Sequence, residues 1–197
     1  MGTRSYCSNC QRPTKTCLCD ALVTLDCNFQ LIILQDPSEA KHALSSAPIL
    51  EKSIRDSKLI IGDVFNPEKI LGLNWKSNSL LVFPGEHALT EQEAKSKKFK
   101  HLILLDGTWR KVTRMLHANE WLQELPCIAI DVQHASQYTI RKSPRTDGLS
   151  TIEAAVYVLN VLHSKQDFAQ ILKAFEKMIA LQISAMGEET FQKNYNV

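Results

Sequence analysis

A group of cysteines near the amino terminus has a spacing that indicates metal chemistry. Its members are Cys7, Cys10, Cys17 and Cys19. Structural zinc sites take four tetrahedral ligands and favour thiolates, so this group predicts a bound zinc ion. The single residue between Cys17 and Cys19 is tighter than the usual two-residue knuckle, which leaves Cys27 or a histidine as an alternative ligand. Four cysteines leave no position open to water, and this predicts a structural ion.

Disulfide bonds are the competing interpretation of these cysteines. Disulfide bonds need an oxidising compartment, but residues 1–25 lack the long apolar run and the small-residue cleavage site of a secretory signal. The sequence therefore favours zinc over disulfide bonds.

No segment reaches transmembrane length, so we expect a cytoplasmic protein without a membrane partner. A chain of 197 residues that is 44% hydrophobic can form one main domain with a small appendage. We therefore predict a zinc-binding segment at residues 1–27 and a main domain at residues 28–197.

The loop that begins at Asp106 is a second candidate for chemistry. It joins a carboxylate, a flexible glycine, a possible helix cap at Thr108 and an aromatic ring at Trp109. Such a carboxylate could accept a proton or bind a cation, and such a ring could stack on a base. A structural interpretation stays open, because Asp and Thr are common in turns from strand to helix and Trp also fills cores.

Two further loops and a helix start surround this candidate in the sequence. One loop is Pro84-Gly85-Glu86, and another runs from Tyr138 to Pro144. The pattern Ser150-Thr-Ile-Glu153 predicts a capped helix, whose first amides could bind a carboxylate or a phosphate or serve only as a cap. The sequence has neither a glycine-rich phosphate fingerprint nor a nucleophile elbow, which argues against nicotinamide, ATP and serine-hydrolase chemistry.

Short apolar runs define the elements that must position these residues. They are Phe29–Leu34, Lys58–Ile61, Ser79–Phe83, His101–Leu105 and Cys127–Asp131. Runs that are apolar on both faces and alternate with helices predict an α/β fold, with a mainly parallel sheet covered by helices on both faces. Two helices close the chain, one from Ser150 and one through Phe168 to Ile179. In such sheets ligands bind beyond the carboxyl ends of the strands, where the polar loops lie.

Two motifs in order carry a family resemblance. Asp106-Gly-Thr-Trp109 resembles the D-x-T-W motif of the DTW-domain family, and Leu149-Ser-Thr-Ile-Glu-Ala154 resembles its second signature. The resemblance covers most of residues 7–163. It also includes the amino-terminal cysteines and three further segments: Asp36–Glu39, Phe83–Glu86, and Tyr138 with Arg141 and Lys142.

The resemblance implies a tRNA-uridine aminocarboxypropyltransferase. Such an enzyme moves the 3-amino-3-carboxypropyl group of S-adenosylmethionine to N3 of a tRNA uridine and releases methylthioadenosine. It also implies a SPOUT-like, trefoil-knotted main domain. The predicted catalytic residues are Asp106, Thr108 and Trp109. The predicted donor site comprises Pro84, Gly85, Glu86, Asp106, Leu149, Ser150, Thr151 and Glu153, and the predicted tRNA contacts are Arg110, Lys111, Tyr138, Arg141 and Lys142.

The sequence leaves alternatives for the function of the protein and for the role of Asp106. A SPOUT-like RNA methyltransferase would use the same donor and leave S-adenosylhomocysteine. A non-catalytic zinc-containing RNA-binding module would bind tRNA without turnover. Within the favoured reaction, Asp106 acts either as the base for uridine N3 or as a ligand for the ammonium or ribose of the donor.

Overall fold

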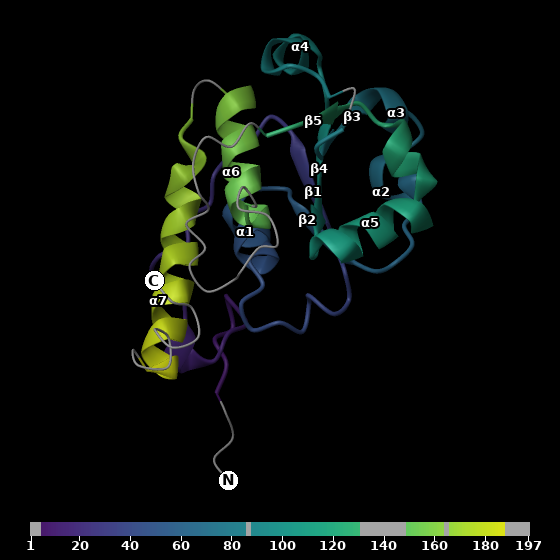
Figure 1. The fold of residues 1–197 in the computed structure, drawn as a ribbon. Coiled ribbons are helices and arrows are strands. Elements are labelled where there is room, and N and C mark those ends of the chain that lie inside the picture. The colour runs from purple at the N-terminus through teal and green to yellow at the C-terminus, as the bar shows by residue number, and fades with distance from the viewer. Residues whose placement is uncertain (1–4, 86–87, 131–148, 164–165, 188–197) are drawn as a thin grey trace.

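A parallel sheet forms the centre of the computed structural model, which describes residues 5–85, 88–130, 149–163 and 166–187. Its strands are β1 (Gln30–Gln35), β2 (Lys58–Ile61), β3 (Ser79–Val82), β4 (His101–Asp106) and β5 (Cys127–Ile128). They lie in the order β2-β1-β4-β3-β5, and every neighbouring pair is parallel (Figure 1). The predicted parallel sheet is thus confirmed, although β5 ends at Ile128 and is shorter than the apolar run suggested.

Helices cover both faces of this sheet, as the apolar runs predicted. One face packs against α1 (Ala47–Ser53), α6 (Thr151–Leu162) and α7 (Leu172–Met186) (Figure 1). The other face packs against α2 (Pro67–Leu71), α3 (Trp75–Asn78) and α5 (Trp109–Ala118). Along β1, Leu31 and Ile33 belong to the first core and Ile32 and Leu34 to the second. Because both faces are buried, the strand is apolar without alternation.

The remaining helices are short or begin with a tighter turn. α4 (Glu91–Ser96) follows β3, and 3₁₀ turns cover Thr14–Thr16, Glu120–Glu124 and Phe168–Ile171. The predicted closing helix therefore starts as a 3₁₀ turn and continues as α7. The capping box predicted at the start of α6 is present, since the Ser150 and Glu153 side chains each bond the other's backbone N–H.

The strand order opens a crevice between β1 and β4. The chain leaves β1 through α1 toward β2, whereas it leaves β4 through α5 toward β5 on the opposite side. Ligands in open α/β sheets bind at such a switch point, beyond the carboxyl ends of the strands. Gln35 and Asp106, the last residues of β1 and β4, are paired in register there.

The cysteine-containing segment packs against this same end of the molecule. Leu18, only 1% exposed, joins the core that α1 and α7 share. Arg12 Nη2 donates to the Ala43 carbonyl at 3.2 Å, and Lys177 Nζ on α7 donates to Asp20 Oδ2 at 2.6 Å. No helix in the described ranges is long and apolar enough to cross a membrane. The connection between β5 and α6, on which a trefoil knot depends, lies outside the described residues.

Candidate active site

Asp106 lies where β1, β4 and α6 meet. Its side chain is buried, with the residue 6% exposed. Gln35 Nε2 donates to Asp106 Oδ2 at 2.6 Å, and Thr151 Oγ1 donates to Asp106 Oδ1 at 2.6 Å. Hydrogen bonds to an ionised acceptor are short and strong, so these two donors fix the orientation of the carboxylate. The two sequence signatures, separated along the chain, are therefore in direct contact.

Gln35 is a member of this cluster that sequence reasoning missed. The same Nε2 that donates to Asp106 also donates to Ser45 Oγ at 2.8 Å. Its Oε1 is buried and has no hydrogen-bond partner within the described part of the chain. The available signal was a polar residue at the end of an apolar run, next to Asp106 in the parallel register. Gln35 thereby links the Asp106 carboxylate to the loop that follows β1.

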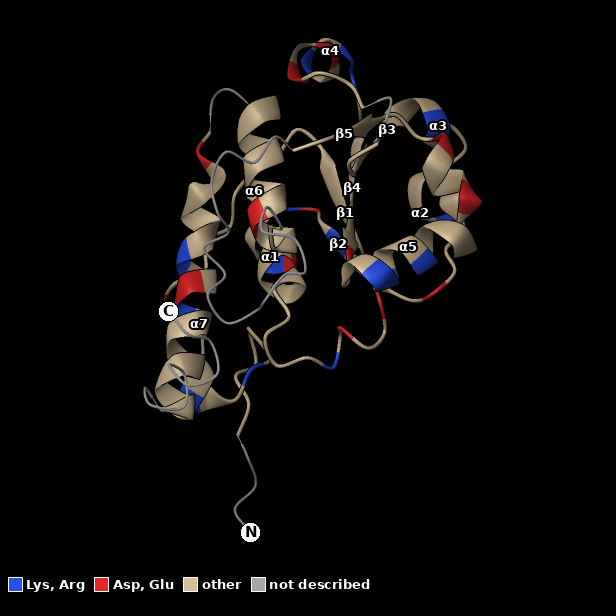
Figure 2. Cartoon of the chain, viewed as in Figure 1, with Lys and Arg blue, Asp and Glu red and all other residues tan. Residues whose placement is uncertain are grey.

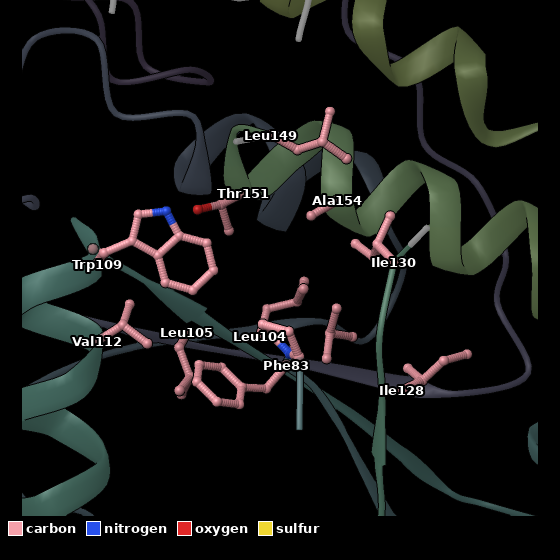
Figure 3. Close-up of a pocket in the computed structure, with 13 residues that line it drawn as sticks. Phe83, Leu104, Leu105, Trp109, Val112, Ile128, Ile130, Leu149, Thr151 and Ala154 are labelled. Carbon is pink, nitrogen blue, oxygen red and sulfur yellow. The ribbon is translucent and has the colours of Figure 1, made fainter. Parts of the chain in front are cut away.

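An apolar cavity of about 170 Å³ lies beside this cluster. Trp109, the first residue of α5, turns its half-buried ring into the cavity next to Phe83, with ring centroids 6.3 Å apart (Figure 3). The cavity is lined by Val82, Phe83, Pro84, Leu104, Leu105, Gly107, Trp109, Val112, Ile128, Ile130, Leu149, Thr151 and Ala154. An engineered apolar cavity of about 150 Å³ binds benzene, so a space of this size accepts an aromatic ring system.

Residues of the second signature divide between this cavity and the helix cap. Leu149 lines the cavity, as does Thr151, which also bonds Asp106. Glu153 Oε2 accepts hydrogen bonds from Ser150 N at 3.0 Å and from Ser150 Oγ at 2.5 Å. Because Ser150 and Glu153 engage each other, their part in donor binding stays a prediction, and the structure shows their role as a cap.

The loop after β3 contributes a wall of the cavity. Pro84 lines it directly. Gly85 lies so close to Cys127 that an added Cβ would be 2.8 Å from its Sγ, which explains the glycine. Four predicted site residues lie outside the described ranges: Glu86, Tyr138, Arg141 and Lys142.

The residues around the start of α5 have different surroundings. Thr108 occupies the N-cap position of α5 but is exposed, and its side chain makes no cap hydrogen bond. Arg110 is exposed, whereas Lys111 Nζ donates to the buried carboxylate of Glu39 at 2.8 Å. The charge of Lys111 thus serves to hold the loop after β1 against α5. Its contact with tRNA stays a prediction, as does that of Arg110.

A second ion pair ties the same loop to α5. Arg114 Nη2 donates to Asp36 Oδ2 at 2.6 Å, and Asp36 Oδ1 accepts from the Ser38 amide and hydroxyl. Burial raises the pKa of the Asp36 carboxyl, but the bonds from Ser38 and the charges of Arg114 and Lys111 outweigh it and hold that pKa below its usual value. The loop therefore has a fixed position beside Asp106, whose carbonyl accepts from the Asp36 amide at 3.0 Å.

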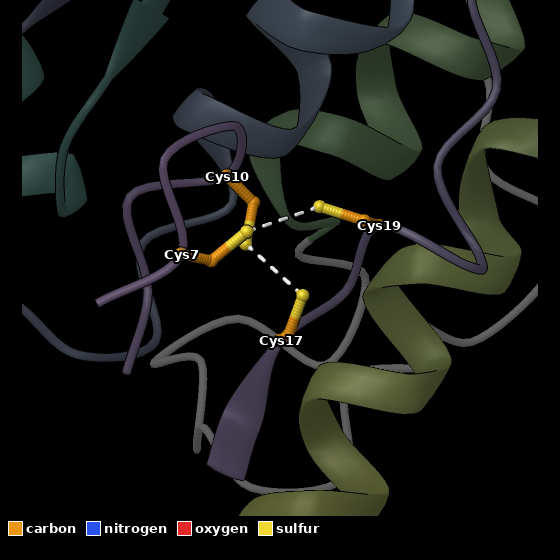
Figure 4. A group of neighbouring side chains, drawn as sticks. All are labelled: Cys7, Cys10, Cys17 and Cys19. Atoms are coloured by element: carbon orange, nitrogen blue, oxygen red, sulfur yellow. Dashed lines mark hydrogen bonds between the residues drawn. The ribbon is translucent and has the colours of Figure 1, made fainter. Parts of the chain in front are cut away.

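The cysteine cluster has the geometry of a four-thiolate metal site. All four Sγ atoms lie within 4.8 Å of one another, with Cys7 to Cys19 at 3.5 Å and Cys10 to Cys17 at 3.7 Å (Figure 4). Tetrahedral zinc with bonds of about 2.3 Å needs sulfurs about 3.8 Å apart. Backbone hydrogen bonds at Cys10 and Asn9 lower the pKa of Cys7 to about 6, which favours the thiolate that zinc binds, whereas the hydrogen bond with Cys7 raises the pKa of Cys19.

Cys27, the alternative ligand, lies elsewhere. Its Sγ accepts a hydrogen bond from the Phe29 amide at 3.4 Å, and its side chain packs against the main core. Burial raises the pKa of this thiol. The group of metal-ligating side chains found among the described residues is the original four, without Cys27.

Comparison with known proteins gives consistent matches. The family model for the DTW domain matches residues 4–183. The chain is 30% identical over 204 residues to tRNA-uridine aminocarboxypropyltransferase 2 of Macaca fascicularis, covering 98% of this chain and 68% of that protein. It is 29% identical over 178 residues to tRNA-uridine aminocarboxypropyltransferase 2 of Drosophila melanogaster, covering 86% and 71% of the two chains. The protein of Arabidopsis thaliana named tRNA-uridine aminocarboxypropyltransferase A is 23% identical over 214 residues, covering 91% and 81%. No solved structure gives a significant match.

Proposed function

The chain belongs to the DTW domain family, and from this premise we propose that it transfers the 3-amino-3-carboxypropyl group of S-adenosylmethionine to N3 of a tRNA uridine. One observation in the structure carries the proposal. The two family signatures meet at one point, where Thr151 Oγ1 donates to Asp106 Oδ1 at 2.6 Å beside an apolar cavity. Because both signatures are typical of the family and meet in one site, we infer that this site carries out the reaction of the family.

The cavity suits the adenine of the donor. Trp109 and Phe83 offer ring faces at its wall, and a base stacked on an aromatic side chain gains roughly 1–3 kcal/mol. Thr151 lines the cavity and bonds Asp106 behind it, so we place the methionine part of the donor toward these two residues. An aminocarboxypropyl transfer requires this part, and not the methyl group, to face the uridine.

Asp106 is proposed as the proton acceptor. Uridine N3 gives its proton to the carboxylate, and the N3 electron pair forms the bond to the carbon next to sulfur. The carbon–sulfur bond breaks, its electrons remain on sulfur, and the sulfonium becomes the neutral thioether of methylthioadenosine. Gln35 and Thr151 position the carboxylate for this step by bonding its two oxygens. A positioned general base contributes on the order of a hundredfold or more.

Zinc is proposed as a structural ion on the four cysteines. The sulfur separations and the hydrogen bonds at Cys7 support it. Such an ion would hold the segment in shape and take no part in the reaction. A SPOUT-like, trefoil-knotted main domain is proposed from the family resemblance.

The test uses donors labelled in different carbons. Unmodified tRNA is incubated with the protein and with S-adenosylmethionine labelled either in the aminocarboxypropyl chain or in the methyl group. Mass spectrometry should find label from the chain alone in a uridine adduct, together with methylthioadenosine. Methyl label in the tRNA with S-adenosylhomocysteine would instead identify a methyltransferase, and tRNA binding without either product would identify a binding module.

A further inference from the structure

A second hollow, much larger than the cavity, lies at the same end of the molecule. It runs between the cysteine-containing segment, the loop of residues 36–46 and the carboxyl-terminal end of α7, and its volume is about 1300 Å³. We call it the basic groove. Small-molecule pockets measure roughly 300–1000 Å³, so this groove is wide enough for an extended chain.

The charges along the basic groove have one sign. Its lining includes Arg12, Lys15, Lys41 and Lys52, and no carboxylate is among the described residues that line it. The three lysines form no ion pair within the described ranges. Figure 2 shows basic positions both on the amino-terminal segment and on the loop after β1. Three uncompensated cations along one channel attract a polyanion.

Acidic residues next to the groove are already paired. Asp20 accepts from Lys177 at 2.6 Å, and Glu39 accepts from Lys111 at 2.8 Å. These pairs reduce the repulsion that a phosphate chain would otherwise meet. Thiolates around a metal would add negative charge at the groove wall, and half-buried Arg12 lies next to Cys10, where its charge offsets theirs.

Arg12 maintains the shape of the groove. Its Nη2 donates to the Ala43 carbonyl at 3.2 Å and its Nη1 to Met178 Sδ at 3.3 Å, while its Nε donates to the Thr16 carbonyl. One side chain thus connects the cysteine-containing segment with the loop after β1 and with α7. The three lysines make no such contacts with other described residues, and so they are available to a ligand.

Two hydrogen bonds link the groove wall to the candidate active site. Ser45 lines the groove, and its Oγ accepts from Gln35 Nε2 at 2.8 Å. The same nitrogen donates to Asp106 at 2.6 Å. Tyr6, which is 58% exposed, adds an aromatic ring to the groove wall, and such rings stack on bases that are not paired. The wall of the groove is therefore separated from the proposed base by the side chains of Ser45 and Gln35.

We propose that the basic groove binds the sugar–phosphate backbone of the tRNA and directs the target nucleotide toward Asp106. This inference rests on the proposed function, which supplies tRNA as the polyanion. Lys15, Lys41 and Lys52 contact phosphates, and these contacts provide affinity and salt dependence without selecting a sequence. Gln11 Nε2 donates one proton to the Ser8 carbonyl at 2.7 Å, and its second N–H is a neutral donor for the same backbone.

The experiment compares two triple variants of equal charge change. The groove variant carries Lys15→Glu, Lys41→Glu and Lys52→Glu. The control variant carries Lys97→Glu, Lys98→Glu and Lys100→Glu, which lie on exposed positions before β4, at the opposite end of the sheet. We expect the groove variant to bind unmodified tRNA at least tenfold more weakly and the control variant within about twofold of wild type. Each lost phosphate contact should also lower the slope of log affinity against log salt by about 1.

Two further readouts separate this inference from the proposed function. Calorimetric titration with S-adenosylmethionine should give unchanged donor affinity in the groove variant, which shows that its fold is intact. If the groove variant binds tRNA as well as wild type, or if the control variant is equally impaired, the groove inference is wrong while the labelled-donor assay still decides the activity. Polyglutamate competing as well as tRNA would mean that the groove binds an acidic protein, which overturns the inference for RNA. If the wild-type protein forms no transferase products, the proposed function is wrong. The tRNA affinities of the groove and control variants then still test whether the groove binds tRNA.

Discussion

The cavity beside Trp109 and the basic groove differ in size and in charge. The cavity measures about 170 Å³ and is lined mainly by apolar residues, whereas the groove measures about 1300 Å³ and its lysines form no ion pair with other described residues. A small site lined by apolar residues suits a compact ring, and a large basic site suits a long polyanion. The two regions meet at Gln35, which bonds Asp106 on one side and Ser45 on the other. Donor affinity and tRNA affinity should therefore respond to different substitutions.

The largest effect is expected where the two regions meet. Asp106→Asn removes the proposed proton acceptor and keeps an oxygen that can accept one of the two existing hydrogen bonds. We expect kcat to fall by on the order of a hundredfold or more, with donor and tRNA affinities close to those of wild type. Single-turnover assays of the uridine adduct with both substrates saturating would measure this loss.

Asp63→Asn is the matched control for this substitution. Asp63 is 65% exposed and pairs with Arg114 near the same end of the sheet, so its loss should leave kcat unchanged. A weaker donor affinity in Asp106→Asn, without a lower kcat, would assign Asp106 to the donor's ammonium or ribose. Full activity would show that Asp106 has only a structural role.

The cysteine cluster allows the groove to be altered without altering the cavity. Cys17→Ser removes one of four thiolates, so zinc content should fall from about one equivalent and the groove wall should lose its shape. We expect tRNA affinity to fall about tenfold or more and donor affinity to change little. Metal analysis and the two binding titrations test this, with Cys27→Ser as the control that keeps its zinc. Loss of zinc in Cys27→Ser but not in Cys17→Ser would contradict the assigned ligand set.

Trp109→Ala should alter the cavity without altering the groove. Loss of a stacking contact worth roughly 1–3 kcal/mol should weaken donor binding by about 5-fold to 150-fold and leave tRNA affinity in place. Trp121→Ala is the control, because Trp121 does not line the cavity and packs instead against Trp75, with its Nε1 donating to the Phe65 carbonyl at 3.0 Å. This control should lower the unfolding temperature without changing donor affinity. Equal donor affinities for Trp109→Ala and wild type would place the adenine elsewhere.

Features that depend on a few neighbouring residues could be predicted from the sequence. The capping box of α6 lies at Ser150 and Glu153, and β2 spans Lys58–Ile61, because a cap motif and short apolar runs bounded by Gly or Pro act over a few residues. The cysteine cluster was predictable for the same reason, since its ligands are close in sequence.

Contacts set by strand register and helix packing could not be predicted in this way. Gln35 bonds Asp106 from 71 residues away, and Lys111 pairs with Glu39 across 72 residues. Nothing near Lys111 in the sequence distinguishes a buried ion pair from a contact with phosphate. Asp106 was identified because it belongs to a motif, whereas Gln35 was missed because only the pairing of β1 with β4 places it there.

The loop that begins at Asp36 borders both regions, and its ion pair gives the smallest expected effect. The folded state lowers the pKa of Asp36, so this carboxylate stabilises the fold above its unfolded pKa of about 3.9, and the contribution is lost as pH falls through the folded value. Asp36→Asn should therefore lower the free energy of unfolding by about 2 kcal/mol at pH 7, because the charged hydrogen bond from Arg114 is lost and the bonds from Ser38 then reach a neutral acceptor. The difference from wild type should shrink as the pH is lowered below about 4, because the wild-type carboxyl then becomes protonated as well. Urea unfolding of both proteins at several pH values measures this difference, and a difference that is constant with pH would mean that the charge of Asp36 does not hold the loop.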